Sequence, residues 1–165
     1  MTKSFYASKL FKSPMKTIFH FWTNPPTSKL WIALPLGYTF FLQVLTGFPK
    51  PDSLKDLDAN ELFVRFSEEL FAYPFWLQDL SHLPLFCGLA WLWSWYLGPT
   101  RSLSTTFKCE AFYIATLYGI INEMAQAFIP DRFPSLGDLI MNLAGVFLGL
   151  ITHSILCRKF GTLAR

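Results

Sequence analysis

Four long apolar segments constrain this chain more than any other feature of its sequence. They cover residues 30–48, 82–98, 107–129 and 136–157. Because a helix needs about 20 mainly apolar residues to cross the hydrocarbon core of a bilayer, each segment is a candidate span. Pro35 and Pro84 lie inside two of them, and membrane helices accept proline where neighbouring groups satisfy the freed carbonyl. The segments predict an all-α integral membrane bundle of four transmembrane helices.

The composition points to the same solvent. Hydrophobic residues make up 52% of the 165 residues and charged residues only 15%, with 18 Phe and 6 Trp. Soluble domains carry about 25% charged residues. One soluble core of this length cannot bury so much apolar surface, so we expect a membrane protein, and the length suits a single domain.

The one long connection, residues 49–81, predicts an amphipathic helix on the outer face of the membrane. Apolar residues recur there with largely helical spacing, at Leu54, Leu57, Leu62, Phe63, Phe66, Leu70 and Phe71. Ser53 and Asp56 have the spacing of a capping box, which would begin a helix at Ser53. Two interpretations stay open: a surface helix that covers the bundle, and a lid over a substrate site.

Residues 1–29 form a basic, aromatic segment that lacks the continuous apolar core of a cleavable signal peptide. Its lysines alternate with Phe, Tyr and Trp, and Pro14 interrupts it. This pattern favours a segment at a lipid surface over a nucleic-acid-binding arm, so we expect no nucleic-acid partner.

The distribution of Lys and Arg predicts the orientation. With a cytoplasmic N-terminus, ten of the 14 basic residues lie on the cytoplasmic side: Lys3, Lys9, Lys12, Lys16, Lys29, Arg101, Lys108, Arg158, Lys159 and Arg165. The positive-inside rule then places both termini in the cytoplasm, in agreement with an even number of spans. We expect a membrane domain at 30–157 and a cytoplasmic tail at 158–165.

The cysteines give no metal or redox motif. Cys87, Cys109 and Cys157 lack CxxC spacing, so they predict neither a zinc site nor a disulfide framework. We expect no metal and no cofactor.

Polar residues interrupt the last two segments, on both sides of the loop that joins them. Glu123 and Gln126 share a helix face before the loop, and Asp138 and Asn142 share one after it. The linking stretch PDRFPSLG is short, so the two helices must be adjacent and antiparallel, with the four side chains at similar depth. Helix rise places Glu123 about 10 Å below the end of its helix, inside the outer leaflet. An acid at that depth is a functional hypothesis by default.

Three further groups extend this pattern. Arg132 lies in the loop, within reach of the two acids, and His82 with Asp79 begins the second span at the same level. Gly145 and Gly149 form a G-x-x-x-G, a packing motif that allows close backbone approach.

Glu110 and His153 lie outside this polar layer, near the inner ends of their spans. There they would pair with each other or with the basic termini.

Each polar residue also has a structural interpretation. Asp138 would only cap its helix by reaching back to the backbone of Ser135, and Arg132 would be an interfacial anchor. His82 would be an interfacial histidine without a role, and Glu123 would make a structural bond to an arginine or asparagine.

In this order, these residues resemble the VanZ-like family of small bacterial membrane proteins. The matching pattern is Glu123-x2-Gln126, Pro130, Arg132, Asp138-x3-Asn142-x2-Gly145-x3-Gly149, preceded by DLSHLPLFCGL from Asp79. Two positions depart from the family: Leu80 replaces the usual lysine, with Asp79 and His82 three apart rather than four, and Asp131 stands where glycine is usual. The resemblance implies an envelope-facing protein of the bacterial inner (cytoplasmic) membrane, linked by its family name to teicoplanin resistance. It implies no reaction.

Three functions follow as hypotheses. In the first, a site binds or remodels a membrane lipid or lipid-linked precursor, and its ligand-binding residues are Glu123, Gln126, Arg132, Asp138, Asn142 and His82. In the second, Glu123 is the general base of an enzyme that acts on a lipid, assisted by His82 or Asp138. In the third, the chain is a structural membrane subunit. A homo-oligomer stays open in all three.

Overall fold

The computed structural model describes residues 14–56, 58, 61–98, 103–106 and 108–160. Residues 1–13 of the predicted basic segment lie outside this part, as do Arg101 and residues 161–165 of the predicted tail. Every element of regular structure in the described part is a helix, which agrees with the predicted all-α class.

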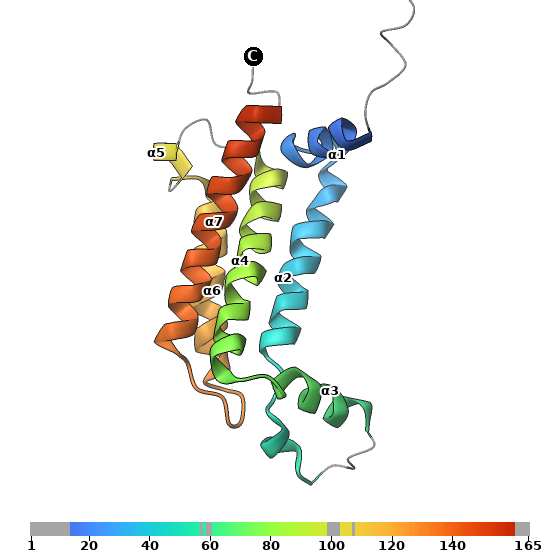
Figure 1. Cartoon of the computed structure of the whole chain (residues 1–165), viewed down its shortest axis with the longest axis vertical. Coiled ribbons are helices and arrows are strands. Elements are labelled where there is room, and N and C mark those ends of the chain that lie inside the picture. The colour runs from blue at the N-terminus through green and yellow to red at the C-terminus, as the bar shows by residue number, and fades with distance from the viewer. Residues whose placement is uncertain (1–13, 57, 59–60, 99–102, 107, 161–165) are drawn as a thin grey trace, which may run out of the picture.

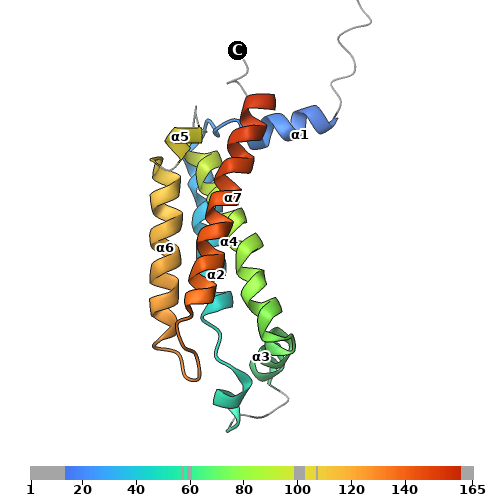
Figure 2. The same cartoon turned by 60° about the vertical axis from the view of Figure 1, so that its left-hand side comes forward.

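Four helices run side by side and form the bundle (Figures 1 and 2). They are α2 (Ala33–Thr46), α4 (Phe75–Leu97), α6 (Glu110–Gln126) and α7 (Leu136–Phe160). The shorter elements are α1 (Pro14–Thr23), η1 (Lys29–Ile32), η2 (Pro51–Leu54), α3 (Leu62–Phe71) and α5 (Leu103–Thr106). Helix α1 and the C-terminal side of α7 lie at one end of the bundle, and α3 lies at the other (Figure 1). We call these the α1 end and the α3 end.

The predicted number of spans is not confirmed. Within the described residues, two helical stretches are both long and apolar enough to cross a membrane: Lys29–Thr46, with mean hydropathy 1.2, and Leu136–Phe160, with 1.9. Helix α6 has only 17 residues, and α4 begins seven positions before the predicted span, at Phe75, so that it includes Gln78 and Asp79.

The amphipathic helix of the long connection exists, but it begins later than predicted. Ser53 lies in the short η2 turn and caps no long helix; its hydroxyl is 2.6 Å from Asp131 Oδ2 and 3.1 Å from the carbonyl oxygen of Pro130. Helix α3 begins at Leu62. The prediction failed because Ser53 has its partners in the α6–α7 loop, 77 residues away, and not in its own segment.

Helix α7 packs most extensively against α4, and two glycines explain why. A Cβ atom added at Gly145 would collide with the carbonyl oxygen of Leu83 and lie 3.0 Å from the backbone nitrogen of Cys87. One added at Gly149 would collide with the carbonyl oxygen of Cys87. The G-x-x-x-G stripe therefore lets two helix backbones come into contact, as such motifs do in membrane helices.

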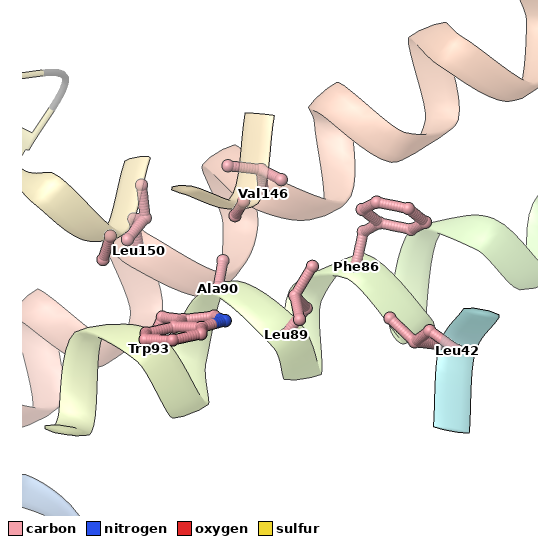
Figure 3. Packing of buried hydrophobic residues seen from close by; sticks show 9 residues of the cluster. Leu42, Phe86, Leu89, Ala90, Trp93, Val146 and Leu150 are labelled. Atoms are coloured by element: carbon pink, nitrogen blue, oxygen red, sulfur yellow. The ribbon is translucent and has the colours of Figure 1, made fainter. Parts of the chain in front are cut away.

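The apolar core lies along α4, as Figure 3 shows. Phe86, Leu89, Ala90 and Trp93 of α4 pack with Leu42 of α2, Ala111 and Ala115 of α6, and Val146 and Leu150 of α7. Because α4 contributes to all these contacts, it is the central helix, and its N-terminal turns carry polar residues into the bundle at the α3 end.

Side chains from the bundle hold α1 by its C-terminal carbonyl groups, which have no partner within the helix. The Trp95 indole Nε1 donates to the carbonyl oxygen of Phe21 at 2.8 Å, and the Cys157 thiol donates to that of Thr23 at 3.2 Å. His153 Nδ1 lies 2.8 Å from Ser94 Oγ, whereas Glu110 is exposed. The predicted pairing of His153 with Glu110 is therefore wrong: α7 turns His153 toward α4.

Candidate functional site

Asn142, fully buried in α7, is the centre of a hydrogen-bonded chain at the α3 end of the bundle. Its amide Nδ2 donates to Glu123 Oε1 of α6 at 3.0 Å. Its Oδ1 lies 2.9 Å from His82 Nδ1 of α4. The Asn142 side chain thus joins α7 to α6 and α4. The predicted contact of Glu123 with Asn142 across the α6–α7 loop is present.

Glu123 is 4% exposed, and both of its carboxylate oxygens accept hydrogen bonds. Oε1 accepts from Asn142, and Oε2 accepts from the backbone N–H of Ser135 at 3.3 Å. In a capping box, that N–H would receive the side chain three residues later, which is Asp138. Here only half of the box forms, since Ser135 Oγ accepts from the Asp138 N–H at 3.3 Å. Glu123 takes the place of the other half, so Asp138 does not have the purely local role that the sequence left open.

Asp138 instead faces His82. Its Oδ1 lies 3.9 Å from His82 Nε2 and makes no hydrogen bond, although the residue is 9% exposed. Asp79, one turn before His82 on α4, lies close enough to Asp138 to interact with it electrostatically. Asp138 thus retains an unused acceptor atom beside the imidazole, an arrangement that costs free energy unless a proton or a ligand compensates it.

Arg132 lies half-buried in the α6–α7 loop with most of its hydrogen-bonding capacity unused. Its Nη2 donates to the carbonyl oxygen of Thr46 at 3.2 Å, and the guanidinium lies 5.2 Å from the ring centre of Phe71. Within the described residues, no carboxylate is within 4.0 Å of it. Burial lowers the pKa of Arg132, and the charges of Asp138 and Glu123 act in the opposite direction. The guanidinium nonetheless stays charged, as arginine does in proteins.

A cavity of about 820 Å³ lies next to Arg132 and His82. Residues of α2, α3 and α4 line it, together with Arg132 of the α6–α7 loop. Most of the lining residues are apolar: Leu45, Leu70, Phe71, Leu77, Leu80, Leu83, Pro84 and Leu85. The polar lining includes Thr46, Gln78 and Ser81 as well as Arg132 and His82. Pockets that bury small molecules have volumes of about 300–1,000 Å³, so this cavity is large enough for part of a lipid.

The six predicted site residues therefore form two groups. His82 and Arg132 line the cavity, whereas Glu123, Gln126, Asp138 and Asn142 do not. Asn142 contacts His82, and Glu123 in turn binds Asn142, so both residues hold the His82 ring without lining the cavity. Gln126 is 2% exposed, and its Nε2 has no hydrogen-bond partner.

A family model described as VanZ/LLP1 matches residues 9–157, nearly the whole chain. The chain belongs to the VanZ/LLP1 family. No curated protein and no solved structure matches it.

Membership in the VanZ/LLP1 family confirms the resemblance found in the motif around Glu123 and Arg132. Together with the two apolar helical stretches, it identifies the chain as a membrane protein.

Two contacts of this candidate site were not predicted from the sequence. Thr46 ends α2, with its hydroxyl 2.6 Å from Asn122 Oδ1 of α6, and its carbonyl group binds Arg132. Ser135 supplies the backbone N–H for Glu123. A threonine at a helix end and a backbone donor carry no pattern that sequence reasoning can detect.

Proposed function

We propose that this chain is a four-span protein of the bacterial cytoplasmic membrane that binds or remodels an envelope lipid or lipid-linked precursor. In this proposal the cavity at the α3 end opens in the outer leaflet, and both termini are cytoplasmic. The count of ten basic residues against four supports that orientation, as does the position of α1 and the C-terminal end of α7 at the same end of the bundle (Figure 1).

The observation that carries the proposal is a mostly apolar cavity with, at its edge, an arginine that forms no salt bridge with any of the described residues. A hydrocarbon chain fits the leucine-rich wall of the cavity. Water would find few polar groups there, so replacing it with a hydrocarbon chain is favourable. An anionic head group fits Arg132, whose guanidinium makes bidentate contacts to phosphate and carboxylate. An amphipathic anion satisfies both parts of the site, and the membrane lipids of a cell envelope are molecules of this kind.

Binding of a lipid-linked cell-wall precursor at this site would change how much of it is free at the outer surface. Susceptibility to teicoplanin-type glycopeptides, which act on that surface, would change with it.

The acid/base alternative receives less support from the geometry. Glu123 does not line the cavity, and Asn142 and Ser135 occupy both of its oxygens. A general base must be within hydrogen-bond reach of the proton it takes.

We expect an anionic lipid to co-purify with the protein, and Arg132→Gln to remove it. Gln keeps a polar side chain but is shorter and lacks the charge, and a hydrogen bond to a charged group contributes about 1.5–3 kcal/mol, which is roughly a tenfold loss of affinity or more. The measurement is lipid mass spectrometry of the gently extracted protein, normalised to one chain.

Arg65→Gln is the matched control. Arg65 is an exposed arginine on α3, at the same end of the bundle, and does not line the cavity. It should keep the wild-type lipid. An unchanged lipid profile in Arg132→Gln, in a protein that extracts and elutes like the wild type, contradicts the proposed function.

A further inference from the structure

The orientation of the His82 ring follows from its neighbours. Because a carboxylate accepts hydrogen bonds and cannot donate them, Asn142 must present Nδ2 to Glu123 and Oδ1 to His82. The carbonyl-type Oδ1 is only an acceptor, so His82 Nδ1 must carry a hydrogen. The nitrogen whose proton can vary is therefore Nε2.

His82 Nε2 is free to bind a ligand in the cavity. His82 lines the cavity, and its Nε2 makes no hydrogen bond, since the nearest carboxylate oxygen, Asp138 Oδ1, is 3.9 Å away. That carboxylate interacts electrostatically with both His82 and Arg132. The two groups thus line one cavity and share an acidic neighbour, Asp138.

We propose that the cavity selects lipids whose head group ends in a phosphate monoester, held by Arg132 on one side and by His82 Nε2 on the other. This inference rests on the proposed function and narrows its ligand class. The second ionisation of a phosphate monoester falls near pH 6, so at neutral pH the monoester still exchanges a proton. A hydrogen bond between its oxygen and Nε2 forms whichever partner supplies that proton.

A phosphodiester head group lacks this second proton. Its phosphate offers Arg132 a single negative charge and has no P–OH that could donate to Nε2. Asn142, held by Glu123, keeps the ring in the orientation that makes this distinction. The hydrogen bonds between Glu123 and Asn142 and between Asn142 and His82 position the His82 ring. Glu123 and Asn142 therefore do not need to contact the ligand.

Competition between two lipids with the same chains tests the selectivity. The full chain in nanodiscs receives equimolar dioleoyl phosphatidic acid, a monoester, and dioleoyl phosphatidylmethanol, a diester whose head group has no hydroxyl, and native mass spectrometry counts the bound molecules of each. We expect the monoester to be preferred about tenfold, the effect of one charge-assisted hydrogen bond. In His82→Gln the preference should fall to within about twofold, with the diester bound as in the wild type.

Controls separate this inference from the proposed function. His20→Gln is the same substitution at an exposed histidine of α1 and should keep the preference. Arg132→Gln should lose both lipids. If the wild type binds both lipids equally, or if His82→Gln keeps the preference, the monoester inference is overturned, while loss of both lipids in Arg132→Gln still supports the proposed function.

A third probe identifies the hydrophobic part of the ligand. A polyprenyl monophosphate competes with the same diester in this experiment, because it presents the monoester head group of phosphatidic acid on a single isoprenoid chain. A preference for either monoester supports the inference and shows which chain the cavity accepts. No preference for either monoester contradicts it, even where His82→Gln fails to fold.

Discussion

Gly145→Ala is expected to lower the free energy of unfolding by about 3 kcal/mol, the upper end of the range for overpacking. The added methyl group would meet the Leu83 carbonyl oxygen and the Cys87 nitrogen, which belong to the backbone of α4 and cannot turn aside. Helices α4 and α7 would have to move apart along their whole contact. Thermal or denaturant unfolding in a mild detergent measures the loss.

Gly37→Ala is the control for this prediction. It makes the same substitution in α2, where an added Cβ has no neighbour within 4 Å. Alanine is favoured over glycine in a helix by about 1 kcal/mol, so this variant should be as stable as the wild type or more so. Equal stability of Gly145→Ala and Gly37→Ala would show that α4 and α7 do not approach as closely as described.

Asn142→Leu is expected to cost about 3 kcal/mol or more, because leaving a buried polar group without its hydrogen-bond partner costs about 1–3 kcal/mol, and more where the group is charged. Leucine has a similar shape but no polar atoms. It leaves Glu123 Oε1 and His82 Nδ1 buried without their partner, and each belongs to a different helix. Unfolding in detergent measures the cost.

A double-mutant cycle shows whether the loss comes from this contact. In Asn142→Leu combined with Glu123→Leu, the unpaired carboxylate is gone, so the double variant should be more stable than the sum of the two single losses predicts. Agreement with that sum to within about 0.5 kcal/mol would mean that the two side chains do not interact.

The sequence predicted the centre of the site because the chain itself forces the contact there. The short loop between α6, which carries Glu123, and α7, which carries Asn142, restricts the register of these two antiparallel helices. The hydrogen bond between the two side chains is present. The glycine stripe was also predictable as a packing face. Which helix it would pack against was not, because spacing identifies a face and not its partner.

The cavity was beyond sequence reasoning. It depends on where α3 and the N-terminal turns of α4 lie relative to α2, and that placement depends on contacts between distant segments. Phe48 stacks against Phe63 and Phe66 of α3 at 4.3 and 4.9 Å between ring centres, and Ser67 Oγ donates to the Pro49 carbonyl oxygen at 2.8 Å. Aromatic and hydroxyl side chains of this kind have many potential partners, so their pattern predicts an amphipathic helix but not the space beneath it.

Photo-crosslinking from inside the cavity tests most directly whether an anionic lipid occupies it. A benzophenone amino acid replaces Leu77, which lines the cavity, or Leu148, an exposed residue of α7, and the cross-linked lipids are identified after irradiation in native membranes. We predict that anionic lipids are enriched at position 77 relative to position 148, and that Arg132→Gln abolishes the enrichment. The same bulk lipid mixture at both positions, with and without Arg132, would contradict the account.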